Sequence, residues 1–170
     1  VSILAEGNGG AYGMYASGRA GSADIASNDI QTGGGVSVTI IAKGGSLENS
    51  WAMFAQNGGS NTITSSSTAA KISQIDIDGG MFAGKNGLNG ITTAAGADKV
   101  SMIGGMLAAN ADDAASVGKN IISTGKGNDV VSISGDIGTQ GSGVYSGQNI
   151  VDTGAGDDII TLAVSSPMGA

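Results

Sequence analysis

Three acidic turns in this sequence have the residue types and the spacing of a metal site. They end at Asp98, Asp129 and Asp158, and each is followed by a short run of β-branched residues. The turns recur at intervals of about 30 residues, a period typical of solenoids whose repeats stack on one another. In such a stack the three aspartates would form a column of carboxylates along one edge of the molecule.

A column of carboxylates favours a hard cation with oxygen ligands, and we expect calcium. Ca²⁺ takes about six to eight oxygens, which carboxylates and the carbonyls of a glycine turn can supply. Stacked coils lie about 4.8 Å apart, so the carboxylates would repel one another unless a cation lay between them. Asn128 and Asp157 each precede one of the acids and would add oxygens or face water. The alternative is a tight turn in which each aspartate caps its own backbone.

The same period extends over the whole chain, which we interpret as one repeat array over residues 1–170. A strand signal, apolar-x-Thr/Ser, recurs upstream of the turn positions at Ile30, Ile63, Ile91, Ile122 and Val151. The predicted fold is all-β, a right-handed parallel β-solenoid of about five coils. From a second signal, apolar-Ser/Thr-apolar, the coils are expected to start near Val1, Val36, Ile72 (a weaker copy), Val100 and Val131, with a partial coil from Ile160.

The two C-terminal acidic turns resemble a known calcium-binding repeat. The pattern Gly-x-Gly-x-Asp-x-apolar is similar to the nonapeptide Gly-Gly-x-Gly-x-Asp-x-apolar-x of RTX (repeat-in-toxin) proteins, with threonine in place of the first glycine. The resemblance implies secreted calcium-binding β-rolls of bacterial adhesins, proteases, lipases and toxins. It implies that Asp129 and Asp158 are ligands, and that the turns present carbonyls at Gly125, Gly127, Gly154 and Gly156. The family has two motifs in a shorter coil, so one motif per coil here predicts one metal edge at most.

The composition restricts the possible functions. The chain has no cysteine and no histidine, so zinc, copper and haem sites lose their usual ligands. The same absence leaves no conventional nucleophile–base pair, and we do not expect an enzyme. A net charge of −7 offers no basic patch for nucleic acid, and no apolar run is long enough for a membrane span.

Pairs of bulky residues recur in the other half of each coil. They are Tyr12 and Tyr15, Trp51 and Phe54, Met81 and Phe82, Met106 and Leu107, and Val144 and Tyr145. Buried, they would be ordinary packing; exposed together, they would form a contact stripe for a surface or carbohydrate partner. The sequence leaves both interpretations open. Between residues 48 and 56, the spacing of Trp51, Met53 and Phe54 predicts one amphipathic helical turn.

These observations predict a calcium-stabilised structural or adhesive module of a larger bacterial surface or secreted protein, extracellular or on the cell surface. Weak calcium sites would fill only after export, because calcium is abundant outside the cell. One alternative is a self-assembling filament or sheath subunit, since Val1 and Ile160 begin strands of one column and bare parallel edges favour head-to-tail association. Another is a β-helical polysaccharide-active enzyme fragment, because two carboxylates suffice for glycoside hydrolysis.

Overall fold

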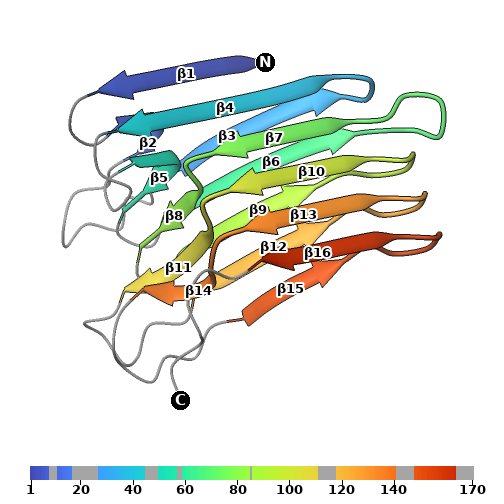
Figure 1. The fold of residues 1–170 in the computed structure, drawn as a ribbon. Coiled ribbons are helices and arrows are strands. Elements are labelled where there is room, and N and C mark those ends of the chain that lie inside the picture. The colour runs from blue at the N-terminus through green and yellow to red at the C-terminus, as the bar shows by residue number, and fades with distance from the viewer. Residues whose placement is uncertain are drawn as a thin grey trace.

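The protein is a three-sided parallel β-solenoid (Figure 1). The computed structural model describes residues 1–7, 11–16, 27–44, 50–56, 59–84, 86–110, 118–140 and 148–163. Within these residues each strand pairs in parallel with the strands three places away in the chain, so that three sheets run along the stack. The prediction of an all-β parallel solenoid of about five coils is confirmed.

Each coil contributes one strand to each sheet, passing from sheet A to sheet B to sheet C. Sheet A contains β1 (Ser2–Gly7), β4 (Ser37–Gly44), β7 (Gln74–Asp78), β10 (Lys99–Ile103), β13 (Val130–Ser134) and β16 (Ile159–Ala163). Sheet B contains β2 (Ala11–Ala16), β5 (Ser50–Ala55), β8 (Met81–Ala83), β11 (Met106–Asn110) and β14 (Ile137–Gln140). Sheet C contains β3 (Ser27–Gly33), β6 (Ser60–Ser66), β9 (Leu88–Thr92), β12 (Lys119–Ser123) and β15 (Gln148–Asp152).

The register confirms one of the two strand signals completely. In sheet C, the residues of the upstream signal pair with one another in a single column: Ile30, Ile63, Ile91, Ile122 and Val151. Their spacing in the sequence therefore predicted the stacking of this sheet residue by residue.

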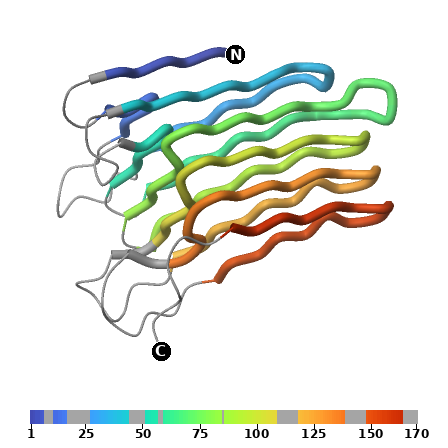
Figure 2. Tube along the Cα trace, viewed as in Figure 1, coloured from blue at the N-terminus to red at the C-terminus, as the bar shows by residue number. Residues whose placement is uncertain are grey.

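The signal for sheet A is shifted in two coils. The column that contains Val100 runs through Ile75 and Val38, which follow the expected starts near Ile72 and Val36 by three and two residues. Ile72 is 53% exposed, in the turn between β6 and β7. This turn extends beyond the turns of the coils on either side of it (Figure 2, green). The turn is longer than those of later coils, so Ile72 within it does not align with the apolar residues that begin the neighbouring strands of sheet A.

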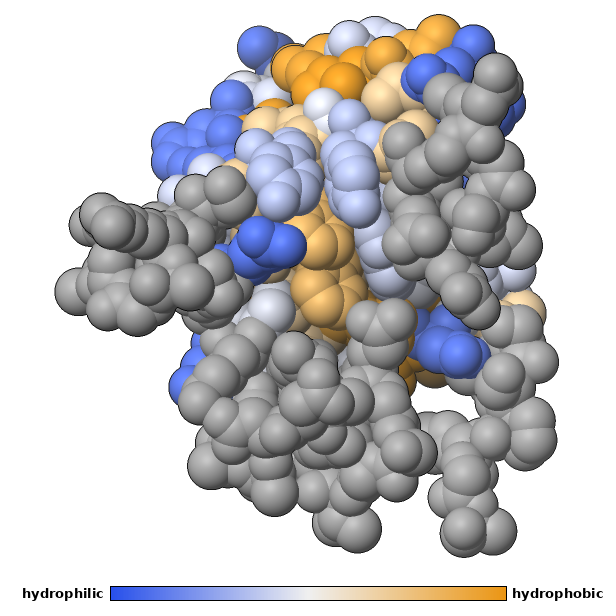
Figure 3. Space-filling view, turned by 90° about the vertical axis from the view of Figure 1, so that its left-hand side faces the viewer, coloured by the Kyte–Doolittle hydropathy of each residue, from blue (hydrophilic) through white to orange (hydrophobic). Residues whose placement is uncertain are grey.

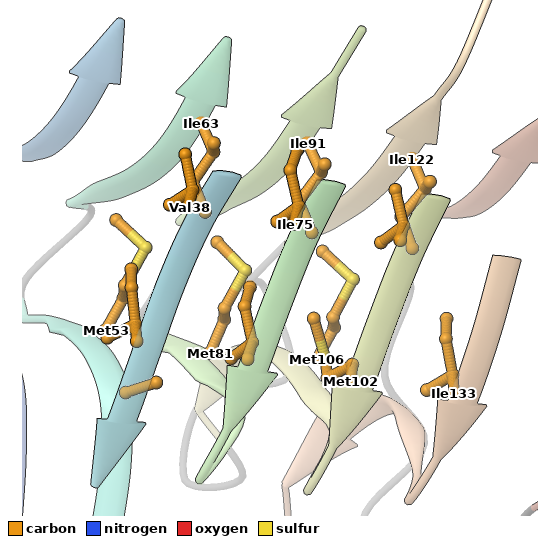
Figure 4. Close-up of a cluster of buried hydrophobic side chains, with 14 of the residues drawn as sticks. Val38, Met53, Ile63, Ile75, Met81, Ile91, Met102, Met106, Ile122 and Ile133 are labelled. Atoms are coloured by element: carbon orange, nitrogen blue, oxygen red, sulfur yellow. The ribbon is translucent and has the colours of Figure 1, made fainter. Parts of the chain in front are cut away.

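The core is a narrow stack of apolar columns parallel to the solenoid axis (Figure 4). Sheets A, B and C each supply at least one column, and the core members with at most 2% exposure include Val38, Ile75, Val100 and Val131, then Met53, Met81 and Met106, then Ile63, Ile91 and Ile122. Each coil buries its apolar face only against its neighbours, as stacked repeats must.

Glycine is required where sheet A turns into sheet B. Gly135 has a φ of 145°, and a Cβ atom there would lie 1.6 Å from the carbonyl oxygen of Gly104. Gly104 has a φ of 115° at the same corner one coil earlier. Backbone stacks directly on backbone at this corner, so a side chain would push adjacent coils apart.

The predicted helical turn at residues 48–56 is wrong for the part that the structure describes. Ser50–Ala55 forms β5, which pairs with β2 and β8. Met53 faces the core and Phe54 faces outward, so the alternation of a strand, and not a helical period, explains these residues. Glu48 lies outside the described residues. Across the described ranges, no helix has the length and hydropathy needed to cross a membrane.

Candidate functional site

The acidic turns lie at the edge where sheet C returns to sheet A, and they stack in register. Lys126 forms parallel bridges to Ala95 in the turn before it and to Ala155 in the turn after it. The strands that follow the turns, β10, β13 and β16, are paired neighbours in sheet A. The predicted column of three aspartates, in three successive turns of this edge, is therefore present.

The carboxylates in this column hold the backbone of the preceding coil. Asp129 Oδ1 accepts the Asp98 N–H over 2.8 Å, and Asp158 Oδ1 accepts the Asp129 N–H over 2.9 Å. Ser73 takes this position one coil earlier, and its N–H donates to Asp98 Oδ1 over 2.6 Å. Asp98 and Asp129 are only 1% and 0% exposed. A backbone N–H thus binds each carboxylate and offsets the repulsion that stacked anions would otherwise have.

The second carboxylate oxygen has a different environment in each coil. Asp98 Oδ2 accepts the Ser67 hydroxyl over 2.6 Å. Asp129 Oδ2 is buried and has no hydrogen-bond partner among the described residues, and the same is true of Thr124 Oγ1. Asp158, in the last described turn, is partly exposed. The column therefore changes from fully satisfied to partly hydrated along the stack.

The other predicted ligands lie toward the outside of this edge. Asn128 and Asp157 are exposed, and Asn128 Oδ1 accepts the Asp157 N–H over 3.0 Å. The Gly125 carbonyl oxygen accepts the Ala155 N–H over 3.1 Å. Positive φ angles occur, as a glycine turn requires, at Gly125, Gly127, Gly154 and Gly156. In the part of the chain that the structure describes, no group of three or more acidic side chains is arranged to hold a metal, so their role as ligands stays a prediction.

Sequence reasoning missed a second side-chain column, made of asparagines in sheet C. It consists of Asn28, Asn61, Asn89, Asn120 and Asn149, which occupy one position on successive strands. Each Nδ2 donates to Oδ1 of the next asparagine over 2.8–2.9 Å, always toward the C-terminal coil. The signal was present: an asparagine stands two residues before the apolar residue of every sheet C strand. We call this column the asparagine ladder.

The asparagine ladder closes the corner between sheets B and C. Asn61 Nδ2 also donates to the Phe82 carbonyl oxygen over 2.7 Å, and Asn89 Nδ2 donates to the Leu107 carbonyl oxygen over 3.0 Å. The loops at this corner differ in length, from residues 17–26 in the first coil to residues 84–87 in the third. The ladder therefore fixes where the chain enters sheet C whatever the length of the loop before it.

The structure separates the two roles of the bulky residues. The methionines of sheet B face the core, whereas Tyr15, Phe54, Phe82 and Leu107 form a column on the outer face. The rings of Tyr15 and Phe54 lie 5.3 Å apart at 2°, and those of Phe54 and Phe82 lie 4.8 Å apart at 14°. A band of apolar and weakly polar side chains runs down this side of the molecule (Figure 3).

The aromatic rings of this outer column stack on one another, so their edges, and not their faces, point to solvent. Tyr12 and Tyr15 are 37% and 51% exposed, and Trp51 is nearly buried. In the fifth coil the two columns continue with Ile137 and Gly138, and the predicted pair Val144 and Tyr145 lies outside the described residues. A surface or carbohydrate partner at this stripe stays a prediction.

On the outer face of sheet C, one carboxylate has a shifted pKa. The pKa of Asp29 is lowered, mainly because the Thr62 hydroxyl donates to it over 2.6 Å and secondly because Gln31 Nε2 does so over 2.8 Å. A carboxylate whose pKa is lowered by folding stabilises the protein at pH values above its ordinary pKa. That contribution is lost as the pH falls through the pKa of the folded state. Because Asp29 is exposed, solvent screening keeps the contribution small.

No family model matches this sequence, and comparisons with curated proteins and with solved structures find no match either. The candidate site therefore rests on its own geometry.

We expect Asn89→Ala to lower the free energy of unfolding by about 2–4 kcal/mol, because it leaves the Leu107 carbonyl and the neighbouring buried asparagines without this partner. Urea denaturation measures the change. Thr92→Ala, on the exposed face of the same strand, is the matched control and should change stability by less than about 0.5 kcal/mol. Equal effects of the two substitutions would contradict a structural role for the ladder.

We expect Asp98→Ala to lower the free energy of unfolding by about 2–4 kcal/mol, since it removes the acceptor of the buried Ser73 N–H and Ser67 hydroxyl. Asp157→Ala is the control, because this acidic side chain is exposed and only its backbone N–H is used. Thermal and urea unfolding in buffer containing a chelator would measure both variants. A loss at Asp98 no larger than that at Asp157 would show that the inward carboxylates do not hold the coils together.

Proposed function

We propose that this chain is a structural β-solenoid module of an extracellular or cell-surface bacterial protein, in which the acidic turns hold successive coils together. One observation carries the proposal: Asp98 and Asp129 are buried and accept backbone N–H groups across coils. Carboxylates used in this way stiffen the stack along its length. The asparagine ladder does the same along another corner, so the polar interior favours a rod or spacer.

Two further considerations support this choice over the alternatives. A polysaccharide-active enzyme would need two accessible carboxylates beside the scissile bond, and the buried oxygens of Asp98 and Asp129 do not meet that requirement. The extracellular location is supported by the resemblance of the turns at Gly125 and Gly154 to RTX repeats. An adhesive function would use the outer face of sheet B, where Tyr12 and Tyr15 are exposed.

Calcium is part of the proposal as an additional stabiliser on the outside of the last turns. The side-chain oxygens that reach solvent there include those of Asn128, Asp157 and Asp158. The Oδ1 atoms of Asp98, Asp129 and Asp158 already accept N–H groups, and Asp129 is buried, so a cation at the outside would find few protein ligands and keep much of its water. Such sites bind calcium weakly, at about 10⁻⁴–10⁻³ M, as extracellular modules do.

Calcium at millimolar concentration should raise the thermal midpoint of the protein by a few degrees, because the ion binds the folded turns and not the unfolded chain. Asp157→Asn should abolish this rise. Asp129→Asn should keep it, although that variant starts from a lower midpoint. Differential scanning calorimetry with calcium, with magnesium and with a chelator provides the measurement.

Two outcomes would change the proposal in different ways. If Asp129→Asn abolished the calcium response, the inward carboxylates would be ligands and the structural explanation of this column would be wrong. If calcium had no effect on the thermal midpoint of the wild-type protein, calcium would be removed from the proposal. The structural role would then rest on the loss of stability that Asp98→Ala causes in the presence of a chelator.

A filament subunit is the second candidate, and the end coils favour it. Ile160 and Leu162 on β16 continue core columns but are 46% and 51% exposed. In the asparagine ladder, every Nδ2 group points toward the C-terminal end of the stack, at Asn149. The Oδ1 acceptors point toward the N-terminal end, at Asn28. A second copy would therefore meet a complementary end. However, sheet A has six described strands and the other sheets have five, so a copy that pairs with β16 leaves one strand position unfilled in sheets B and C.

We expect weak, concentration-dependent association in sedimentation velocity, because the exposed edge of β16 pairs with strands of another copy. Ile160→Asp should reduce it by placing a charge in the core column at this edge. Ile103→Asp is the control, since Ile103 is 58% exposed on the outer face of sheet A, away from the ends of the stack. A monomer at every concentration, or equal effects of both variants, would exclude association through this end.

A further inference from the structure

Two neighbouring corners of the acidic edge differ in whether a hydroxyl group meets the second carboxylate oxygen. The Asp98 corner lies between the turn that contains Ser67 and the turn that ends at Asp98; the Asp129 corner lies one coil further on. At the Asp98 corner, the Ser67 hydroxyl donates to Asp98 Oδ2 over 2.6 Å and accepts the N–H groups of Ala94 and Ala95 over 2.8 and 3.1 Å. One oxygen atom thus joins the carboxylate to the turn backbone.

The Asp129 corner has the same groups without this hydroxyl. Lys126 pairs with Ala95, so the N–H groups of Gly125 and Lys126 follow those of Ala94 and Ala95 one coil on. Between Thr93 and Asp98 the chain has only alanine and glycine. Asp129 Oδ2, in a residue that is 0% exposed, is left without a hydrogen-bond partner among the described residues.

A third polar group belongs to the same corner. Thr124 Oγ1 is buried and likewise without a partner in the described part of the chain. Thr124 and Asp129 hold the column positions that Ser65 and Ser73 hold two coils earlier, where the two hydroxyl oxygens lie 2.6 Å apart. By analogy with that pair, the unpartnered groups of Thr124 and Asp129 would border the same small region of the interior.

We propose that the Asp129 corner binds one buried water molecule, which takes the role of the Ser67 hydroxyl. Water would donate to the carboxylate oxygen and accept from the Gly125 N–H, which the register places where the Ala94 N–H meets the Ser67 hydroxyl one coil earlier. Buried waters typically make about three hydrogen bonds to groups that the protein leaves unpaired, and Thr124 Oγ1 supplies the third. A bare cation does not fit, because the N–H points its positive end at the site. This proposal is independent of the function proposed above.

A high-resolution crystal structure of the full chain, grown with and without calcium, tests the proposal directly. We expect one density peak in both crystals, at about 2.7–3.0 Å from Asp129 Oδ2 and from Gly125 N. A corner without density would overturn the proposal. So would a peak surrounded by about six or more oxygens at 2.3–2.6 Å, which would be calcium.

Ser67→Ala provides a matched test, because it leaves Asp98 Oδ2 without its hydroxyl partner, as Asp129 Oδ2 is in the wild-type protein. A second water should then appear at Asp98 Oδ2, and Thr68→Ala, at the exposed neighbouring residue, should add none. A folded Ser67→Ala protein without that water would contradict the proposal.

Solution NMR of the wild-type protein keeps the proposal testable if the Ser67→Ala variant fails to fold. The Gly125 N–H should show a cross-peak with a long-lived water. The Lys126 N–H, which donates to the Ala94 carbonyl oxygen over 3.0 Å, should show none. Absence of the cross-peak at Gly125 would overturn the water site.

Discussion

The solenoid depends on every coil entering sheet C at the same height, and the asparagine ladder sets that height. Shared apolar columns exist only if equivalent residues of successive coils lie directly above one another. Loops of unequal length before sheet C would allow the register to slip. Each asparagine prevents this by bonding at once to the next asparagine and to a sheet B carbonyl, as Asn61 does with Asn89 and Phe82. A slip of one residue would break both bonds inside an apolar core.

The acidic edge solves the corresponding problem between sheets C and A by a different route. Short glycine turns leave little freedom of register there, but they bring carboxylates of successive coils close together. The protein satisfies each carboxylate with the N–H of the residue that holds the same position one coil earlier, as Asp129 does with Asp98. Charge, hydrogen bonding and register are thereby coupled in one contact, which explains why the acids recur so regularly in the sequence.

The fold could be predicted well from the sequence, because in a solenoid the spacing of equivalent residues reflects the register of the stacked strands. The sheet C column from Ile30 to Val151 is correct throughout, since its coils differ only in loops that leave the strands in frame. Sheet A was misplaced at Ile72 because a longer turn carries an apolar residue at a similar spacing. Sheet B was not recognised as a separate sheet, since its strands are as short as Met81–Ala83 and their pattern mixes core and outer residues.

The site was harder to predict than the fold, because residue type does not specify which way a side chain points. An aspartate after a glycine turn can bind a metal at the surface, and it can equally well accept hydrogen bonds from backbone N–H groups in the interior. The burial of Asp98 and Asp129 distinguishes these cases, and it depends on a neighbouring coil far away in the sequence. The asparagine column was missed because a single buried amide is easily taken for a turn residue, whereas five in register are a structural element.

Because its bonds all run in one direction, the asparagine ladder also gives the solenoid an electrical axis. Its side-chain amides donate toward the C-terminal coil from Asn28 to Asn149, so their dipoles add instead of cancelling. In a low-dielectric interior, aligned hydrogen bonds polarise one another and strengthen along the chain of contacts. The ladder therefore contributes a dipole of its own, with its positive end at Asn149 and its negative end at Asn28, as aligned peptide units do in an α-helix.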